Sequence, residues 1–103
     1  MIYDTFLFYN ELDLLEIRLH ELSEAVDWFV LLEASRTFTN KPKPMVFRDH
    51  KSRFSDFLDR IIHVEINVFE DVDTSNAWQM ECYLRRRLLL GLQRCTEKDV
   101  ILL

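Results

Sequence analysis

The chain has 103 residues, of which 49% are hydrophobic and 30% are charged, and its formal net charge at pH 7 is −5. This length allows a single domain with a modest core, and the composition is that of a globular protein. The acidic balance argues against a partner that is bound through bulk positive charge, such as a nucleic acid or an anionic membrane. One glycine and two prolines exclude a low-complexity linker.

The first segment, "MIYDTFLFYNELD", lacks the basic residues and the long apolar run of a secretory signal. No stretch approaches the ~18 uninterrupted apolar residues that a membrane-spanning helix needs. We therefore expect a cytoplasmic chain without a membrane segment. Cys82 and Cys95 fall in one predicted helix, roughly 20 Å apart at ~1.5 Å per residue, so we expect both thiols to be reduced.

The N-terminal half alternates predicted strands with a helix. Residues 2–8 are rich in aromatic and β-branched side chains and predict a strand. Leucines then repeat at helical spacing over residues 11–24, with Asn10 as the expected N-cap. The apolar run of residues 27–34, "DWFVLLEA", predicts a strand that is buried on both faces. Residues 35–44, "SRTFTNKPKP", predict a polar loop without regular structure, because the segment holds two prolines.

The second half continues the alternation. We expect a short helix over 52–60, a strand over 61–68 ("IIHVEINV"), a helix over about 76–95 and a strand over 99–103. Asn76, followed three residues later by Gln79, resembles a capping box at the start of the last helix. Strands that alternate with helices in this way indicate an α/β fold with a mostly parallel, Rossmann-like sheet.

Ligands bind such sheets beyond the carboxyl ends of the strands. The rule points to residues 9–10, 33–37 and 69–73. In the loop after the second strand, Glu33 is followed by Arg36 and Thr37, and then by Lys41 and Lys43. A carboxylate accepts from ribose hydroxyls or a uracil N–H, and Arg and Lys suit phosphates. The alternative is a solvated loop with an ordinary Glu–Arg pair.

Asp71 and Asp73 form a second candidate feature, an Asp-x-Asp pair after the third strand. Paired carboxylates can hold Mg²⁺ or Mn²⁺ against a diphosphate. Acidic residues are also favoured just before a helix by the helix dipole. Both interpretations stay open at this point.

Glu81 and Arg85 lie four residues apart in the last predicted helix, near the edge of a core stripe formed by Leu84, Leu88 and Leu92. The pair is either buried or ligand-facing, or it is an exposed ion pair worth only about 0.3–0.5 kcal/mol. His63 alternates with apolar neighbours in a strand and indicates a packed or surface residue rather than a catalyst. No Ser/His/Asp order, glycine-rich phosphate loop or zinc-ligand spacing is present.

The chain resembles the N-terminal part of glycosyltransferase family 17 in four segments: "FLFYNELDLLEIRLHEL", "VDWFVLLEASRTFTNKPKP", "AWQMECYLRRRLLLGL" and "KDVILL". The resemblance covers essentially the whole chain, and its most specific parts are "FYNELDLLEIRLHEL" and "EASRTFTNKPKP". This family includes the β-1,4-mannosyl-glycoprotein β-1,4-N-acetylglucosaminyltransferases. The resemblance implies that residues 1–103 form a single partial domain, the nucleotide-binding half of a GT-A-like nucleotide-sugar transferase fold.

The resemblance also implies a reaction and a set of site residues. Family members transfer a sugar, typically N-acetylglucosamine from its UDP donor, to a glycan acceptor with the help of Mn²⁺ or Mg²⁺. By position, Glu33, Arg36 and Thr37 fall in the loop that contacts the nucleotide. Glu81 and Arg85 match the family's helix pattern, and we expect Arg85 to aid phosphate binding or site structure.

The chain departs from the family pattern at two places. Asn40 stands where family members often have glycine, but asparagine tolerates the left-handed backbone conformation. In the family, the strand matching "DVILL" leads into an Asp-x-Asp-Glu motif that binds the metal and the diphosphate, and this sequence stops before it. We therefore expect a fragment that is inactive alone, with no catalytic residue and no bound metal. The alternative is a standalone α/β binding or interaction module, whose unfinished sheet edge would favour self-association.

Overall fold

The computed structural model describes residues 1–37, 39–69, 72–73, 75–92, 96 and 99–102. These residues form a sheet of four parallel strands in the order β3-β2-β1-β4. The strands are β1 (Ile2–Phe8), β2 (Trp28–Ala34), β3 (Ile61–Ile66) and β4 (Val100–Leu102). The predicted α/β fold with a parallel, Rossmann-like sheet is thereby confirmed.

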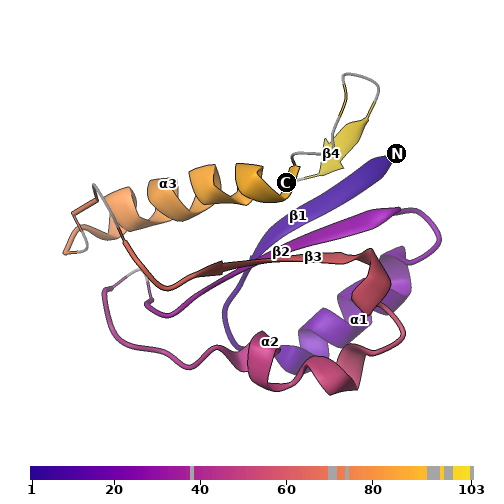
Figure 1. The fold of residues 1–103 in the computed structure, drawn as a ribbon, viewed down its shortest axis with the longest axis horizontal. Helices are drawn as coiled ribbons and strands as arrows, with labels where there is room; N and C mark the ends of the chain where they lie inside the picture. Colours follow the sequence, from indigo (N-terminus) through magenta and orange to yellow (C-terminus); the bar gives the residue numbers. More distant parts are fainter. Residues whose placement is uncertain (38, 70–71, 74, 93–95, 97–98, 103) are drawn as a thin grey trace.

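Helices cover both faces of the sheet (Figure 1). The helices α1 (Leu12–Leu22) and α2 (Val46–Asp49) pack on one face, and α3 (Ala77–Arg87) packs on the other. The chain moves outward from β1 through β2 to β3 and then returns across the sheet to β4. The direction of winding therefore reverses beside β1, and doubly wound sheets bind ligands at such a reversal.

The strand β2 is buried on both faces, as its apolar run predicts. Phe29 and Leu31 belong to the core under α1, whereas Val30 and Leu32 belong to the core under α3. Alternate residues of a strand point to opposite faces, so an apolar run of this kind supplies both cores at once. Each fully buried side chain of this size contributes about 1.5–3 kcal/mol relative to leaving it in water.

The helix α1 is two residues shorter at its C-terminal end and one residue shorter at its N-terminal end than the predicted range 11–24. Leu15 and Leu19 are buried against the sheet, which confirms the amphipathic pattern. The predicted cap is wrong, because Glu11 occupies the N-cap position and no side chain caps the helix. Asn10 contributes only its carbonyl, which accepts from the Leu12 N–H at 3.2 Å.

Short turns replace the helix expected over residues 52–60. Two 3₁₀ turns, at Lys51–Phe54 and Leu58–Arg60, occupy this part of the chain, and the single-turn helix α2 precedes them. Phe54 and Phe57 are both buried. Their spacing of three residues fits 3₁₀ geometry, in which positions i and i+3 align, better than a longer α-helix.

The last predicted helix, over residues 76–95, is also shorter in the structure. Asn76 does cap α3, since its Oδ1 accepts from the Gln79 N–H at 3.1 Å. After Arg87 the chain tightens into a 3₁₀ turn at Leu88–Leu92, and residues 93–95 lie outside the described part. Gly91 lies in this turn so close to β2 that an added Cβ would be 2.3 Å from a Val30 methyl carbon.

Two composition-based predictions fall partly on residues that the structure does not describe. Cys82 is a free thiol of intermediate burial, and Cys95 is outside the described residues. Among the described residues, no helix is long and apolar enough to cross a membrane.

Candidate functional site

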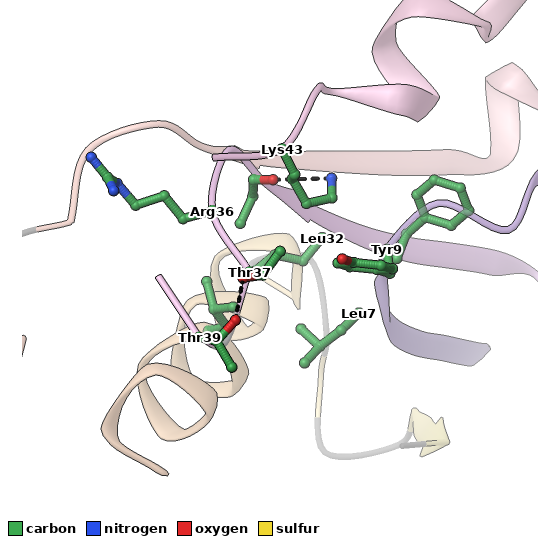
Figure 2. A pocket seen from close by; sticks show the side chains of 10 residues that line it. Leu7, Tyr9, Leu32, Arg36, Thr37, Thr39 and Lys43 are labelled. Atoms are coloured by element: carbon green, nitrogen blue, oxygen red, sulfur yellow. Dashed lines mark hydrogen bonds between the residues drawn. The ribbon is translucent and has the colours of Figure 1, made fainter. Parts of the chain in front are cut away.

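A cavity of about 400 Å³ lies beyond the carboxyl ends of β1 and β2, on the face covered by α3 (Figure 2). Its apolar lining consists of Leu7, Phe8, Leu32, Ala34 and Leu84, and its polar lining of Tyr9, Arg36, Thr37, Thr39 and Lys43. A largely apolar hollow with a few convergent polar groups is the usual form of a small-molecule site. The position agrees with the sequence-based rule, which pointed to residues 9–10 and 33–37 at this edge.

The loop after β2 is a tight hairpin and not the irregular segment that its prolines suggested. The Lys43 N–H donates to the Ser35 carbonyl and the Thr37 N–H donates to the Lys41 carbonyl, both at 2.9 Å. Arg36 and Pro42 pair between them in an antiparallel bridge. Asn40 has a φ of 61°, which confirms the left-handed turn expected there. We call the described residues of this segment, 35–37 and 39–43, the pocket hairpin.

Two of the predicted site residues, Arg36 and Thr37, lie in the pocket hairpin and line the cavity. The Arg36 Nη1 donates to Asn40 Oδ1 at 3.0 Å, and Figure 2 shows the guanidinium extending away from Tyr9. The Thr37 hydroxyl lies 3.0 Å from that of Thr39 and accepts from the backbone N–H of Lys41 at 3.1 Å. Both residues are exposed or half-buried, so their polar groups are open to a ligand.

Lys43 lies between the pocket hairpin and the sheet with only 7% of its side chain exposed. Its Nζ donates to the carbonyls of Ala34 at 3.1 Å and Pro44 at 2.9 Å, and lies 5.8 Å from the centre of the Tyr9 ring. Burial lowers the pKa of Lys43, and the nearby Glu33 carboxylate partly opposes this shift. The ammonium is thus held by carbonyl oxygens and a carboxylate at the base of the cavity.

Glu33 is fully buried on the opposite face of β2 from the cavity. Its carboxylate accepts from the N–H groups of Phe47 at 2.6 Å and Arg48 at 3.1 Å, at the start of α2. The structure therefore turns this side chain toward the helix and does not bring it to the cavity lining. Its direct contact with a nucleotide stays a prediction.

The polar groups around Glu33 explain why a carboxylate tolerates this position. Lys43 Nζ lies 3.9 Å from Oε2, and His63 Nε2 lies 3.3 Å from Oε1. Burial by itself would raise the pKa of Glu33, but His63, the two backbone N–H groups and Lys43 outweigh it and hold this pKa below its usual value. His63 also packs edge-on against the Phe47 ring at 4.8 Å, which fits the predicted packed histidine.

The comparison with protein families decides the class of protein to which this fold and cavity belong. The model of glycosyltransferase family 17 matches residues 1–103. The chain belongs to glycosyltransferase family 17. The resemblance read from the four sequence segments is therefore confirmed.

Curated relatives carry the name β-1,4-mannosyl-glycoprotein 4-β-N-acetylglucosaminyltransferase. The human protein is 32% identical over 78 residues, which is 74% of this chain and 15% of the relative. The rat and mouse proteins are 32% and 31% identical over the same length, at 14% of each relative. This family 17 chain thus spans about a seventh of the length of these relatives. No solved structure matches it.

The other two site residues carried over from the family pattern lie apart from the cavity. The Arg85 Nη2 and the Glu81 Oε1 are 3.2 Å apart, and 59% of the Arg85 side chain is exposed. Of the alternatives that the sequence left open, the structure favours an exposed ion pair on α3. The adjacent core stripe is confirmed, since Leu84 and Leu88 are buried and Leu92 packs against the same core.

Asp73 lies in the segment before α3, and Asp71 is outside the described residues. The Asp73 carboxylate accepts from the Ser75 N–H at 3.0 Å and the Ser75 hydroxyl at 2.5 Å, and these bonds lower its pKa. Its carbonyl accepts from the N–H of Asn76, the cap of α3, so the contacts favour the helix-start interpretation. Within the described ranges no three His, Cys, Asp or Glu side chains gather to hold a metal.

The sequence missed the apolar walls of the cavity and the position of Lys43. Leu7 and Leu32 looked like ordinary strand residues, yet both face the cavity because strand residues alternate between faces. Lys43 looked like one of several loop cations. The available signal was its position three residues after Asn40, which favours a hairpin turn. In a hairpin the second arm runs back along the first, so Lys43 is brought close to the end of β2.

Proposed function

We propose that this chain is the donor-binding part of a family 17 glycosyltransferase, which accommodates a UDP-sugar, in particular UDP-N-acetylglucosamine, in the cavity beside the pocket hairpin. The observation that carries the proposal is the cavity itself, at the edge where a doubly wound sheet binds ligands. The names of the relatives support the sugar, and family membership supports the class of reaction.

The lining suits a ligand with one flat, apolar end and one anionic end. Leu32, Ala34 and Leu84 offer surface against which a nucleobase packs, and the half-exposed Tyr9 ring stands at the opening. The Arg36 guanidinium is free to exchange its neutral Asn40 partner for a phosphate, with which it forms a stronger, charge-assisted bond. The Thr37 hydroxyl adds a donor to a ribose or phosphate oxygen.

Sugar transfer to a glycan acceptor belongs, in this proposal, to a longer protein. The chain covers 14–15% of its relatives, and it supplies donor binding rather than the acceptor site. In that longer protein a divalent cation, Mn²⁺ or Mg²⁺, would neutralise the charge that develops on the departing UDP. We propose no residue of this chain as its ligand.

Titration of the ¹⁵N-labelled chain with UDP-N-acetylglucosamine, followed by NMR, tests the site. Saturable shifts at the amides of Tyr9, Arg36 and Thr37 are expected, with free N-acetylglucosamine as the negative control. Replacing Arg36 with alanine should weaken binding about tenfold, the effect of losing one charge-assisted hydrogen bond. Arg86→Ala removes an exposed α3 arginine away from the cavity and should leave binding unchanged. Shifts confined to other surfaces would contradict the proposal.

A further inference from the structure

We propose that Lys43 is a positioning residue, whose buried ammonium fixes the pocket hairpin and Tyr9 in the arrangement that forms the cavity. The two carbonyls that it contacts belong to Ala34, the last residue of β2, and to Pro44, directly after the pocket hairpin. Tyr9 directly follows β1. One side chain therefore connects the ends of both central strands to the hairpin (Figure 2).

The surroundings of Lys43 favour this role over direct contact with a ligand. Its Nζ has two carbonyl acceptors at 3.1 and 2.9 Å and the Glu33 carboxylate at 3.9 Å. A ligand would have to compete with all three for the same ammonium. Arg36 differs, because its guanidinium is held only by a side-chain amide among the described residues and reaches outward from the hairpin.

Glu33 completes the arrangement from the other side of β2. It balances the buried charge of Lys43 while its carboxylate accepts from two N–H groups in the first turn of α2. A buried cation that contacts polar groups on several elements fixes their relative positions, since moving any of them leaves it unsatisfied. The consequence for donor binding rests on the proposed function, whereas the ordering of the hairpin does not.

Hydrogen exchange of the free chain tests the ordering directly. Lys43→Met should speed exchange of the Thr37 amide about tenfold relative to the Leu31 amide in the core, because the hairpin opens locally. The double variant Glu33→Gln, Lys43→Met removes both buried charges. It should keep the fast exchange at Thr37, because removing the second charge does not restore the contacts of Lys43 with the Ala34 and Pro44 carbonyls. Slow exchange at Thr37 in both variants would overturn the proposal.

Binding provides the second readout. Both Lys43 variants should bind UDP about tenfold more weakly than the unmodified chain. Arg18→Met, which disrupts a partly buried ion pair on the far face of the sheet, should lower stability without changing either Thr37 exchange or UDP affinity. Full UDP affinity in the double variant would show that Lys43 only balances charge. If the unmodified chain binds no UDP, the proposed function fails while the exchange result still decides the role of Lys43.

Discussion

Asp4 is a carboxylate in the middle of β1, and only 2% of its side chain is exposed. Arg18 on α1 donates to both of its oxygens, from Nε at 2.7 Å and from Nη2 at 2.6 Å, and stacks over the Phe6 ring at 4.3 Å. This bidentate geometry is the strong form of an arginine–carboxylate contact. Nothing in the sequence links positions 4 and 18, which only the packing of α1 on β1 brings together.

Replacing Arg18 with methionine should therefore cost about 2–3 kcal/mol of unfolding free energy. The loss arises because Asp4 stays buried without its counter-charge, and it falls below the 3–5 kcal/mol of a wholly buried pair because 40% of the Arg18 side chain is exposed. Urea unfolding measures it. Arg85→Met is the matched control, since its exposed pair should contribute less than about 0.5 kcal/mol. Equal losses of unfolding free energy in the two variants would contradict the claim that burial makes the Arg18–Asp4 pair the stronger one.

The Glu33 carboxylate should make the chain sensitive to acid. Its pKa in the folded chain lies below its usual value of 4.5, so between these two values the unfolded chain binds more protons than the folded one. Stability is then fully present above the usual pKa and is lost as pH falls through the folded pKa.

Glu33→Gln should be less stable at pH 7 by about 2–3 kcal/mol, because a charge-assisted acceptor of two buried N–H groups is lost. As the pH falls below 4.5, Glu33→Gln should also lose less additional stability than the unmodified chain does. Urea unfolding at each pH measures both effects. Glu24→Gln, which makes the same exchange at an exposed carboxylate on the surface, serves as the control. Identical pH slopes with and without Glu33 would rule out this source of acid sensitivity.

At the scale of elements, the sequence predicted whether a segment is a helix or a strand better than it predicted where each helix begins and ends. Leucine spacing and the Asn76 cap identify α1 and α3, because both are local properties of the chain. The end of α3 is decided elsewhere. The 3₁₀ turn that follows it lies against β2 and β3, and Gly91 makes this close approach possible.

Gly91→Ala should destabilise the chain by about 1–3 kcal/mol. The new methyl group would overlap the Val30 side chain, which is fully buried and β-branched and so cannot swing aside. Thermal or urea unfolding checks the value. Leu89→Ala, a change at a residue that is 62% exposed in the same turn, should have a much smaller effect. If the Gly91→Ala chain were as stable as the unmodified chain, the 3₁₀ turn would be free to move away from β2 and the prediction would be wrong.

At the scale of the whole molecule, the sheet has two outer strands, β3 and β4. The strand β4 has three residues and pairs with only the first part of β1, from Ile2 to Asp4. Its Val100 and Ile101 side chains are 52% and 42% exposed. An edge with exposed apolar side chains and no charge is a template for pairing with another chain.

We therefore expect self-association that increases with concentration, measured by sedimentation velocity. Ile101→Lys should reduce it, because a lysine on an edge strand opposes strand pairing and the site is already partly exposed. Leu89→Lys makes a comparable exchange at an exposed apolar residue outside the strands and should leave association as it was. A monomer at every concentration would remove the sheet edge as an interaction surface.

The sequence predicted some residues of the candidate site and missed others, and the difference has a physical reason. Arg36 and Thr37 were found because they directly follow a strand, and strand ends meet at one edge of a parallel sheet. Glu33 is the last residue but one of that strand, yet the alternation of side chains turns it to the opposite face, where it accepts from two N–H groups of α2. Lys43 was missed because its role depends on contacts with Ala34, Pro44 and Glu33 that spacing does not reveal.

The sequence by itself determined the class of fold, the apolar central strands and the family to which the chain belongs. These follow from periodicity, from side-chain type and from motifs, all of which are encoded by residues close together along the chain. The tertiary structure alone decided which charges are buried, which residues form the walls of the cavity and where α3 ends. Those outcomes depend on residues far apart in sequence meeting at a fixed distance, as Lys43 meets Glu33 and Arg18 meets Asp4.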